Sequence, residues 1–176
     1  MKPLYKIKRG LDINLDGVAA KELQTLLPSN EYAVSPLDFT GITPRLTVKV
    51  GDYVMAGEAL FVDKASERIK FVSPVSGEIT AIERGERRKL LHVCVKASAQ
   101  QENKDFGKLD AGKASREDVV EYLLNSGMFA FIRQRPYDVV ASPADAPKAV
   151  FVSTFSKMPL AADINYVLQG REEAFK

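Results

Sequence analysis

A histidine and a cysteine, two residues apart, are the side chains of this sequence best suited to binding a metal ion. His92 and Cys94 lie in the segment Leu-Leu-His-Val-Cys-Val, which is predicted to be a strand, so they share one face. With Cys 1 and His 1 in the whole chain, an internal disulfide, a four-cysteine iron–sulfur site and an unaided structural zinc site are excluded. We expect a half-buried strand face, with a metal-binding pair as the alternative.

A second concentration of reactive side chains is the basic segment Arg84-Gly-Glu-Arg-Arg-Lys89. Its glycine and charge predict a solvated hairpin turn. The alternative is a docking contact on a neighbouring subunit, because a guanidinium pairs with a carboxylate through two parallel hydrogen bonds. That contact would use Arg84, Arg87 and Arg88. Beyond these segments the sequence indicates no Ser-His-Asp set and no paired carboxylates, so we predict no catalytic residue, no cofactor-binding residue and no metal ligand.

Composition places these residues in an ordinary globular protein. The chain has 176 residues, of which 45% are hydrophobic and 27% are charged, enough for one domain and part of another. The formal net charge of +2 is too small to indicate a nucleic-acid partner. The start lacks a signal-peptide pattern, and no apolar run approaches the roughly 20 residues of a membrane-spanning helix. We therefore expect a chain without a membrane span.

The middle of the chain is predicted to be a small β barrel or sandwich. After an N-terminal arm over residues 1–35, the segment 36–97 carries short apolar runs separated by turns containing glycine or proline. The predicted strands are residues 45–50, 59–62, 69–72, 78–82 and 90–95.

Helical signals begin after a polar stretch. Residues 98–147 are expected to hold a solvated linker, a helix over 116–126 and a further connection. Ser115 can cap the first turn of this helix together with Asp118, and Gly127 suits its end. The run Ala-Val-Phe-Val-Ser-Thr, residues 149–154, predicts a buried parallel strand, and a helix is expected between Leu160 and Gln169. Because one strand and one helix cannot complete an α/β domain, we expect residues 148–176 to be the first βα unit of a truncated Rossmann-like domain.

Two parts of the β segment resemble the barrel-sandwich hybrid fold of biotinyl and lipoyl domains. They are the run from Val48 to Leu60, with Gly51, Asp52 and Gly57, and the run Phe-Val-Ser-Pro-Val-Ser-Gly-Glu-Ile beginning at Phe71. Glycine allows the positive φ of tight turns, and the aspartate can accept backbone N–H groups in its own turn. The fold class expected is therefore mixed α/β: a barrel-sandwich hybrid module plus the start of a Rossmann-like domain.

Lys64 could act as a carrier lysine in such a module. Asp63-Lys64-Ala65 matches the tripeptide around the lipoylated lysine of lipoyl domains. A carrier lysine stands at a hairpin tip midway between the two halves, whereas Lys64 lies four residues after Leu60 and ten before Pro74. We expect a surface lysine, and a lipoyl or biotin carrier stays open as an alternative.

Over nearly its whole length the chain resembles the NqrA subunits of the sodium-pumping NADH:quinone oxidoreductases. It is also similar to the RnfC subunits of the related ferredoxin:NAD oxidoreductases. The residues that carry the resemblance occur in the same order here: Ile-Lys-Arg-Gly-Leu-Asp-Ile from Ile7, Leu-Asp-Phe-Thr-Gly-Ile-Thr-Pro from Leu37, Leu-Phe-Val-Asp-Lys from Leu60, Ser-Pro-Val-Ser-Gly from Ser73 and Ile-Glu-Arg-Gly-Glu-Arg-Arg from Ile82. Asp63-Lys64 and the Arg-Gly-Glu-Arg-Arg turn separate this family from ordinary lipoyl domains.

The stretch after the predicted helix separates the two relatives. RnfC and the flavin subunit of respiratory complex I carry Gly-Gly-Ala-Gly-Phe-Pro-Thr there, whose backbone can approach FMN and NADH phosphates. Here only Gly127 and Pro136 remain, and bulky Met128, Phe129 and Phe131 replace the small residues. The resemblance thus favours NqrA, with a flavin- and NADH-binding subunit like RnfC as the alternative. The family's link to quinone reduction suggests an apolar slot with a cationic rim, formed by Phe129, Phe131, Arg133 and Arg135.

The resemblance implies a function at the level of a complex. Such a complex passes electrons from NADH through flavins and an iron–sulfur centre on other subunits to ubiquinone or menaquinone, and exports Na⁺. This chain would contribute to the quinone end or to a scaffold on the cytoplasmic side of the bacterial inner membrane. By itself it is expected to bind no cofactor and to be inactive, its partners being the other subunits, with quinone possible.

Overall fold

The computed structural model describes residues 16–17, 19–153, 156, 158 and 160–175. Two compact units divide the chain: residues 27–146, and residues 1–26 together with 147–176. Most of the predicted N-terminal arm, residues 1–15, lies outside the described residues. No helix in the described part of the chain is long and apolar enough to cross a membrane.

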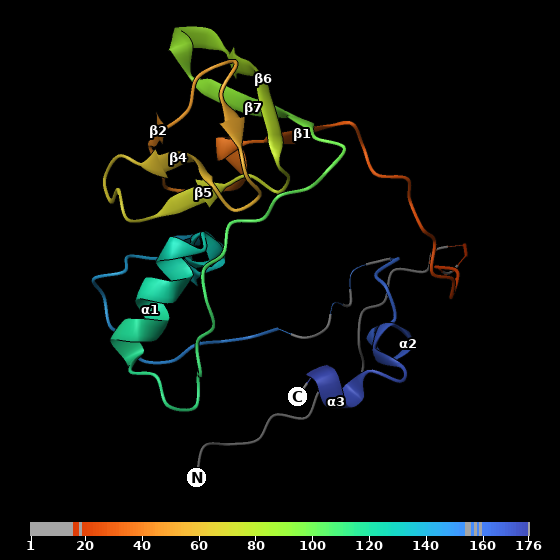
Figure 1. The fold of residues 1–176 in the computed structure, drawn as a ribbon. Helices are drawn as coiled ribbons and strands as arrows, with labels where there is room; N and C mark the ends of the chain where they lie inside the picture. Colours follow the sequence, from red (N-terminus) through yellow and green to blue (C-terminus); the bar gives the residue numbers. More distant parts are fainter. Residues whose placement is uncertain (1–15, 18, 154–155, 157, 159, 176) are drawn as a thin grey trace. The chain divides into compact units, whose positions relative to one another are not determined.

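The first unit is built on two antiparallel sheets (Figure 1). One sheet has the strand order β1-β7-β6-β3, and the other has the order β2-β4-β5. The strands, in chain order, are β1 (Glu31–Val34), β2 (Pro44–Leu46), β3 (Tyr53–Val54), β4 (Ala59–Asp63), β5 (Lys70–Val72), β6 (Gly77–Arg84) and β7 (Leu90–Ala97). All five predicted strand regions overlap an observed strand. In addition, β1, inside the segment expected to be an arm, pairs with β7 and extends the first sheet.

The core follows from the alternation of apolar residues along these strands. In β7, Val93 and Val95 are fully buried, whereas His92 and Cys94 on the opposite face are half-buried. Residue Ile79 of β6 lies opposite Val95, and the β6–β7 ladder places Ile82 opposite Val93. The sheets enclose one apolar cluster that also includes residues of the later helical segment: Leu60, Phe61, Phe71, Leu124 and Phe129.

Tight turns shape the module where the sequence places glycine. Gly51 and Gly57 both adopt φ 92, a conformation that residues with a side chain rarely take. The carboxylate of Asp52 accepts a hydrogen bond from the backbone N–H of Lys49 at 2.7 Å. These predicted turn roles are confirmed.

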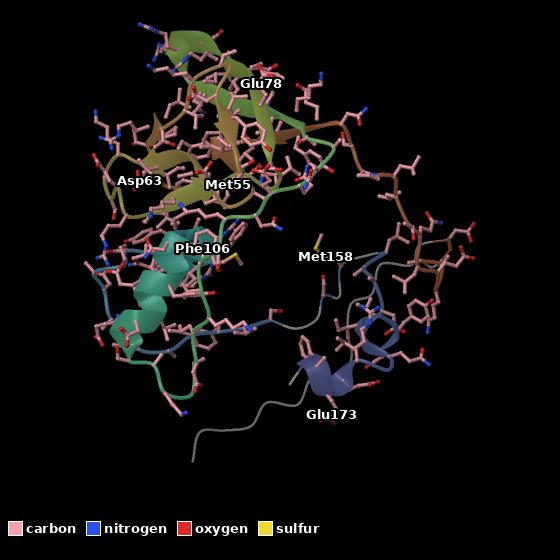
Figure 2. The ribbon with its side chains drawn as sticks, viewed as in Figure 1. Met55, Asp63, Glu78, Phe106, Met158 and Glu173 are labelled. Carbon is pink, nitrogen blue, oxygen red and sulfur yellow. The ribbon has the colours of Figure 1, made fainter. Side chains whose placement is uncertain are left out.

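The polar stretch after β7 is largely exposed, as expected, but it is hydrogen-bonded to the module. The Ala56 N–H donates to the Glu102 carbonyl, and the Lys104 N–H donates to the Ala56 carbonyl, both at 2.9 Å. The ring of Phe106, labelled in Figure 2, lies against Gly57, where an added Cβ would come within 2.9 Å of it. This segment therefore forms part of the folded unit.

Helix α1 (Arg116–Asn125) confirms the capped helix predicted from the sequence. It is followed by the 3-10 helix η3 (Met128–Phe131) and a small hairpin of β8 (Arg133–Gln134) and β9 (Val139–Val140). Two further 3-10 turns are η1 (Pro36–Asp38) and η2 (Glu86–Arg88).

The second unit contains two short helices, α2 (Ile164–Leu168) and α3 (Glu172–Phe175). The strand predicted over residues 149–154 is wrong for the described residues 149–153, which are extended but unpaired. Val150, Phe151 and Val152 are 73%, 91% and 81% exposed. An apolar run forms a strand only beside a neighbouring strand that satisfies its backbone, and none of the described residues supplies one. The predicted helix after Leu160 is confirmed only as the short α2, which Asp163 caps.

Candidate functional site

A line of aromatic rings leads from the core of the first unit to its surface. Phe61 and Phe71 are buried and stacked, with ring centroids 4.8 Å apart. Phe71 meets Phe39 edge-on at 4.5 Å, and Phe39 meets Phe131 edge-on at 5.7 Å. Phe131 is 65% exposed. Edge-to-face pairs are favourable, so these contacts hold an apolar ring open to solvent in a defined orientation.

The two phenylalanines predicted for the quinone region have different environments. Phe129 is 6% exposed and packs in the core, whereas Phe131 lies at the surface. Both belong to η3, a turn of about three residues in which positions two apart cannot share a face. Phe131 is therefore the ring available to a ligand, and Phe129 anchors the turn from inside. Met128 and Ile132, 53% and 37% exposed, are further apolar side chains beside it in sequence.

Gly127 sets the position of this turn. It has φ 77, and a Cβ added there would lie 2.6 Å from Cγ1 of Val72 in β5. The backbone therefore packs directly on the sheet. On the other side, the Ala141 N–H donates to the Ile132 carbonyl at 2.9 Å, and the Val140 N–H donates to the Thr40 carbonyl at 3.0 Å. The β8–β9 hairpin thus returns to the segment that carries Phe39.

The predicted cationic rim is present at the surface. Arg133 and Arg135 are exposed in and beside β8. Nη1 of Arg133 lies 2.9 Å from Oδ2 of Asp138. This exposed pair is weak, so the guanidinium can exchange its carboxylate for another acceptor at small cost. The structure thus brings Phe131 and Arg133 into consecutive elements, with Arg135 at the end of β8.

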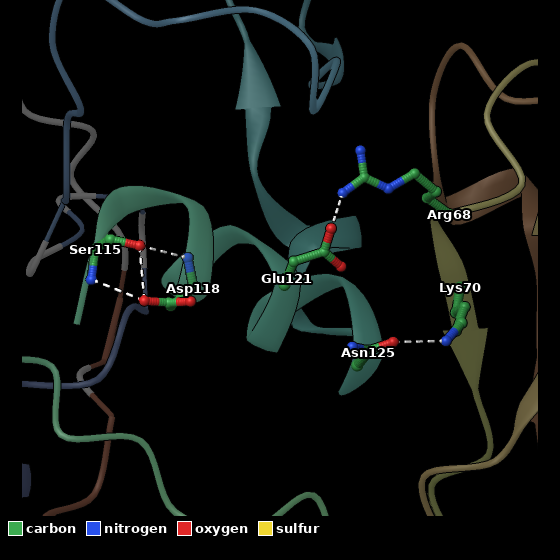
Figure 3. A network of polar contacts seen from close by, with 6 residues as sticks. All are labelled: Arg68, Lys70, Ser115, Asp118, Glu121 and Asn125. Carbon is green, nitrogen blue, oxygen red and sulfur yellow. Dashed lines mark hydrogen bonds and ion pairs between the residues drawn. The ribbon is translucent and has the colours of Figure 1, made fainter.

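Polar contacts tie helix α1 to the β4–β5 connection (Figure 3). Arg68 forms an ion pair with Glu121, and Nζ of Lys70 donates to Oδ1 of Asn125 at 2.9 Å. At the start of the helix, Oγ of Ser115 accepts from the Asp118 N–H at 3.1 Å, and the Asp118 carboxylate accepts from the Ser115 N–H at 3.1 Å. Hydrogen bonds from the Ser115 hydroxyl and then its N–H hold the pKa of Asp118 below its ordinary value.

The basic segment forms the loop at the far end of the β6–β7 hairpin. Arg84, Arg87 and Arg88 are all exposed. Nη1 of Arg84 donates to the Arg88 carbonyl at 3.0 Å, and the Gly85 N–H donates to the Lys89 carbonyl at 2.8 Å. In the part of the chain that the structure describes, these arginines form no ion pair. The predicted hairpin turn is present, with its cations directed to solvent.

Two regions of the chain match sequence models of one family in the order expected. The NqrA N-terminal barrel-sandwich hybrid domain matches residues 5–98, and the NqrA second alpha/beta domain matches residues 114–176. The chain belongs to the NqrA family. The expected fold class, a barrel-sandwich hybrid module followed by an α/β domain, is thereby confirmed.

Curated members of the NqrA family match across nearly the whole chain. A protein of Pseudomonas aeruginosa is 35% identical over 98% of this chain and 39% of its own length. Proteins of Hahella chejuensis and Yersinia pestis are each 33% identical with the same coverage. All three are named as the A-type subunit of a Na(+)-translocating NADH-quinone reductase. The chain spans about two fifths of the length of these relatives.

The metal-binding alternative gains no support from the NqrA-family chain. His92 and Cys94 share a half-buried face, and burial, then Glu83 and Glu31, raise the pKa of the Cys94 thiol. Among the described residues, no three histidine, cysteine, aspartate or glutamate side chains are grouped to hold a metal ion.

Lys64 occupies the first position after β4 and is exposed. Its N–H donates to the Thr43 carbonyl at 2.7 Å. The preceding Asp63, labelled in Figure 2, is buried and accepts hydrogen bonds from the N–H groups of Thr43 and Ala65. In this NqrA-family module the Asp-Lys pair thus organises the start of the β4–β5 connection.

Sequence reasoning missed Phe39 and Asp138 as members of the aromatic surface. Phe39 lay in the motif Leu37-Asp38-Phe39 that carried the resemblance to the NqrA family, which was the available signal. Its contact with Phe131 links residues far apart in the chain. Asp138 could have been suggested only by its charge and its nearness to Arg133.

Proposed function

We propose that this chain is part of the NqrA subunit of a Na⁺-translocating NADH-quinone reductase. The observation that carries the proposal is the succession of two NqrA domains along one chain, at residues 5–98 and 114–176. The curated relatives, at 33–35% identity, are named for that complex. In the intact complex, NADH is oxidised, quinone is reduced and Na⁺ is exported.

The part assigned to this chain is that of a scaffold or of one wall of the quinone end. It lies on the cytoplasmic face of the membrane, attached to other subunits. The flavins and iron–sulfur centre belong to those subunits. In support, the described residues lack a group of metal-ligating side chains, and bulky residues occupy the stretch after Gly127 where related flavin subunits are rich in glycine.

The quinone contact assigned to this chain is the surface around Phe131. An exposed ring can pack against a quinone ring or its tail, and arginine can donate hydrogen bonds to the quinone carbonyls. Phe131 supplies the ring, and Arg133 and Arg135 supply the donors. Phe129 contributes by fixing η3 to the core.

The quinone contact is tested with the substitutions F131A and R133A in the full-length subunit within the complex. A quinone analogue should bind about tenfold more weakly to the double variant, because one apolar contact and one charged hydrogen bond are lost. A matched control is Y53A with K49A, an exposed aromatic and an exposed cation elsewhere on the module. Equal affinity of the wild type and a folded F131A/R133A complex would remove quinone from this surface.

The assembly is tested by affinity capture of the full-length subunit from its native membrane, with mass spectrometry of the co-purifying proteins. Recovery of the membrane subunits of the Na⁺-translocating reductase supports the proposal. Recovery of ferredoxin-linked partners would move the chain to the sister complex. Recovery of soluble acyltransferases, with a mass increase on Lys64, would establish a carrier module instead.

A further inference from the structure

The loop between β6 and β7 concentrates the positive charge of the chain. Its six residues, 84–89, include four cations and one carboxylate, whereas the formal net charge of the whole chain is +2. The remainder of the chain is therefore slightly acidic. The loop closes the hairpin of the two longest strands, each of 8 residues. Figure 1 shows it at the opposite side of the module from helix α1.

The backbone of this loop holds arginine where glycine or asparagine would be easier. Arg87 and Arg88 have φ 53 and φ 62, in the left-handed region. For residues with a Cβ this region costs about 1–2 kcal/mol each. Hairpin turns with two positive φ values usually use Asn-Gly or similar pairs. Bulky cations kept at strained positions indicate that the side chains have a use outside the fold.

The loop is also preorganised. The Arg84 side chain bonds the Arg88 carbonyl, and the Gly85 N–H bonds the Lys89 carbonyl. Among the described residues, Arg87 and Arg88 have no carboxylate partner. A fixed backbone with unpaired guanidinium groups can bind an anionic surface without first ordering a flexible segment.

We propose that this loop docks on a cluster of carboxylates on another subunit of the reductase, with Arg87 and Arg88 each pairing a carboxylate through two hydrogen bonds. The proposal rests on the proposed function, since it needs that complex as its partner. The side chains favour carboxylates because three of the four cations are arginine, whose planar group matches a carboxylate in geometry.

A lipid surface suits the loop less well. A few cations give weak attachment to anionic lipid, and stable attachment needs a second, apolar signal. No large exposed apolar side chain of the described residues lies between Glu83 and His92. The loop therefore lacks the anchor that a membrane contact would use.

The first test compares three forms of the full-length subunit expressed with the other subunits. R87E/R88E reverses the charge of the loop, and K49E/K108E makes the same charge change at exposed lysines elsewhere on the module. The loop variant should co-purify at least about tenfold less, and the control within about twofold of the wild type. Equal recovery of R87E/R88E and wild type overturns the inference. Failure of the wild-type subunit to recover the reductase overturns the proposed function itself.

A glycine substitution separates docking from a structural role. R88G removes a cation and relieves the left-handed strain, while the Arg84 bond to the backbone carbonyl is retained. The 176-residue chain should melt about 2–4 °C higher, yet the full-length R88G subunit should co-purify less. Lower stability together with unchanged assembly would show that Arg88 serves the fold alone, and would overturn the inference.

Cross-linking identifies the partner. A carbodiimide activates a carboxylate, and an amine within contact distance displaces the resulting urea to form an amide. Lys89 provides that amine in the assembled complex, and K89R keeps the charge while removing the cross-link. A Lys89 amide to an aspartate or glutamate of another subunit supports the inference. Absence of that amide, with binding of the subunit to phosphatidylglycerol vesicles that R87E/R88E abolishes, would assign the loop to lipid and overturn it.

Discussion

The surface around Phe131 and the loop between β6 and β7 are both exposed, but they are attached to the fold in opposite ways. Phe131 touches Phe39, which touches buried Phe71, so its position depends on packed rings. The basic loop is joined to the core only through its strands, and its arginines point to solvent. A surface continuous with the core couples binding to stability, whereas a projecting loop can change partner with little effect on the fold.

The largest effect should come from the ring that connects the aromatic surface to the core. F71A removes a buried ring that contacts both Phe61 and Phe39 and should lower the free energy of unfolding by about 3–5 kcal/mol. F131A, as the matched control, should cost about 1 kcal/mol, because it removes one edge-on contact from a largely exposed ring. Urea unfolding followed by circular dichroism measures both. Similar costs would contradict a graded path from core to surface.

The attachment of η3 to the sheet gives the next effect. G127A adds a Cβ at φ 77 and 2.6 Å from Val72, so it should cost about 2–3 kcal/mol from strain and overpacking. G51A is the control, since Gly51 has φ 92 but nothing within 4 Å of an added Cβ. It carries the backbone strain alone and should cost less. The V72A background should recover the difference between the two variants, and unchanged costs there would remove the clash as the cause.

The helix that leads into η3 should show a smaller, pH-dependent effect. S115A removes the capping hydroxyl and should cost about 1 kcal/mol near neutral pH. Because Ser115 lowers the pKa of Asp118, the ionised carboxylate stabilises the fold above its ordinary pKa. That contribution is lost as pH falls through the lowered value. The stability difference between wild type and S115A should therefore shrink in acid. S99A, at an exposed serine outside the helix, should show no such trend in thermal unfolding.

The smallest effect on stability should come from the basic loop. R87A/R88A removes two exposed cations while leaving a Cβ at each strained position, so unfolding should shift by no more than about 0.5 kcal/mol. Urea unfolding in parallel with F71A makes the contrast direct. A loss near that of F71A would mean that the loop is part of the core's support, and the distinction between the two surfaces would fall.

The β module could be predicted because its signals are local. Glycine at 51 and 57 fixes two turns, and alternation in Leu90–Ala97 fixes which side of the strand is buried. The strand at Glu31–Val34 was not predicted, since its pairing with β7 depends on residues some 60 positions away. The run at 149–153 was predicted as a strand, but hydrophobicity alone supplies no neighbour for its backbone.

The candidate surfaces were predicted as residue types, and their environments were not. Spacing placed Phe129 and Phe131 together, yet a 3-10 turn sends one ring into the core and leaves the other in solvent. The turn character of Arg84–Lys89 followed from its glycine and charge. The left-handed backbone at Arg87 and Arg88 could not, because arginine seldom adopts it.

The polar stretch that joins the two NqrA domain matches has a consequence for how the molecule unfolds. The first match ends at residue 98, but backbone bonds from Ala56 to Glu102 and Lys104, and the ring of Phe106 on Gly57, bind the following residues to the sheets. Helix α1 is fastened to the same unit. The boundary of the sequence family and the boundary of the cooperative folding unit therefore differ. A fragment ending at residue 98 is expected to melt earlier than one ending at 146, although both contain every strand of the two sheets.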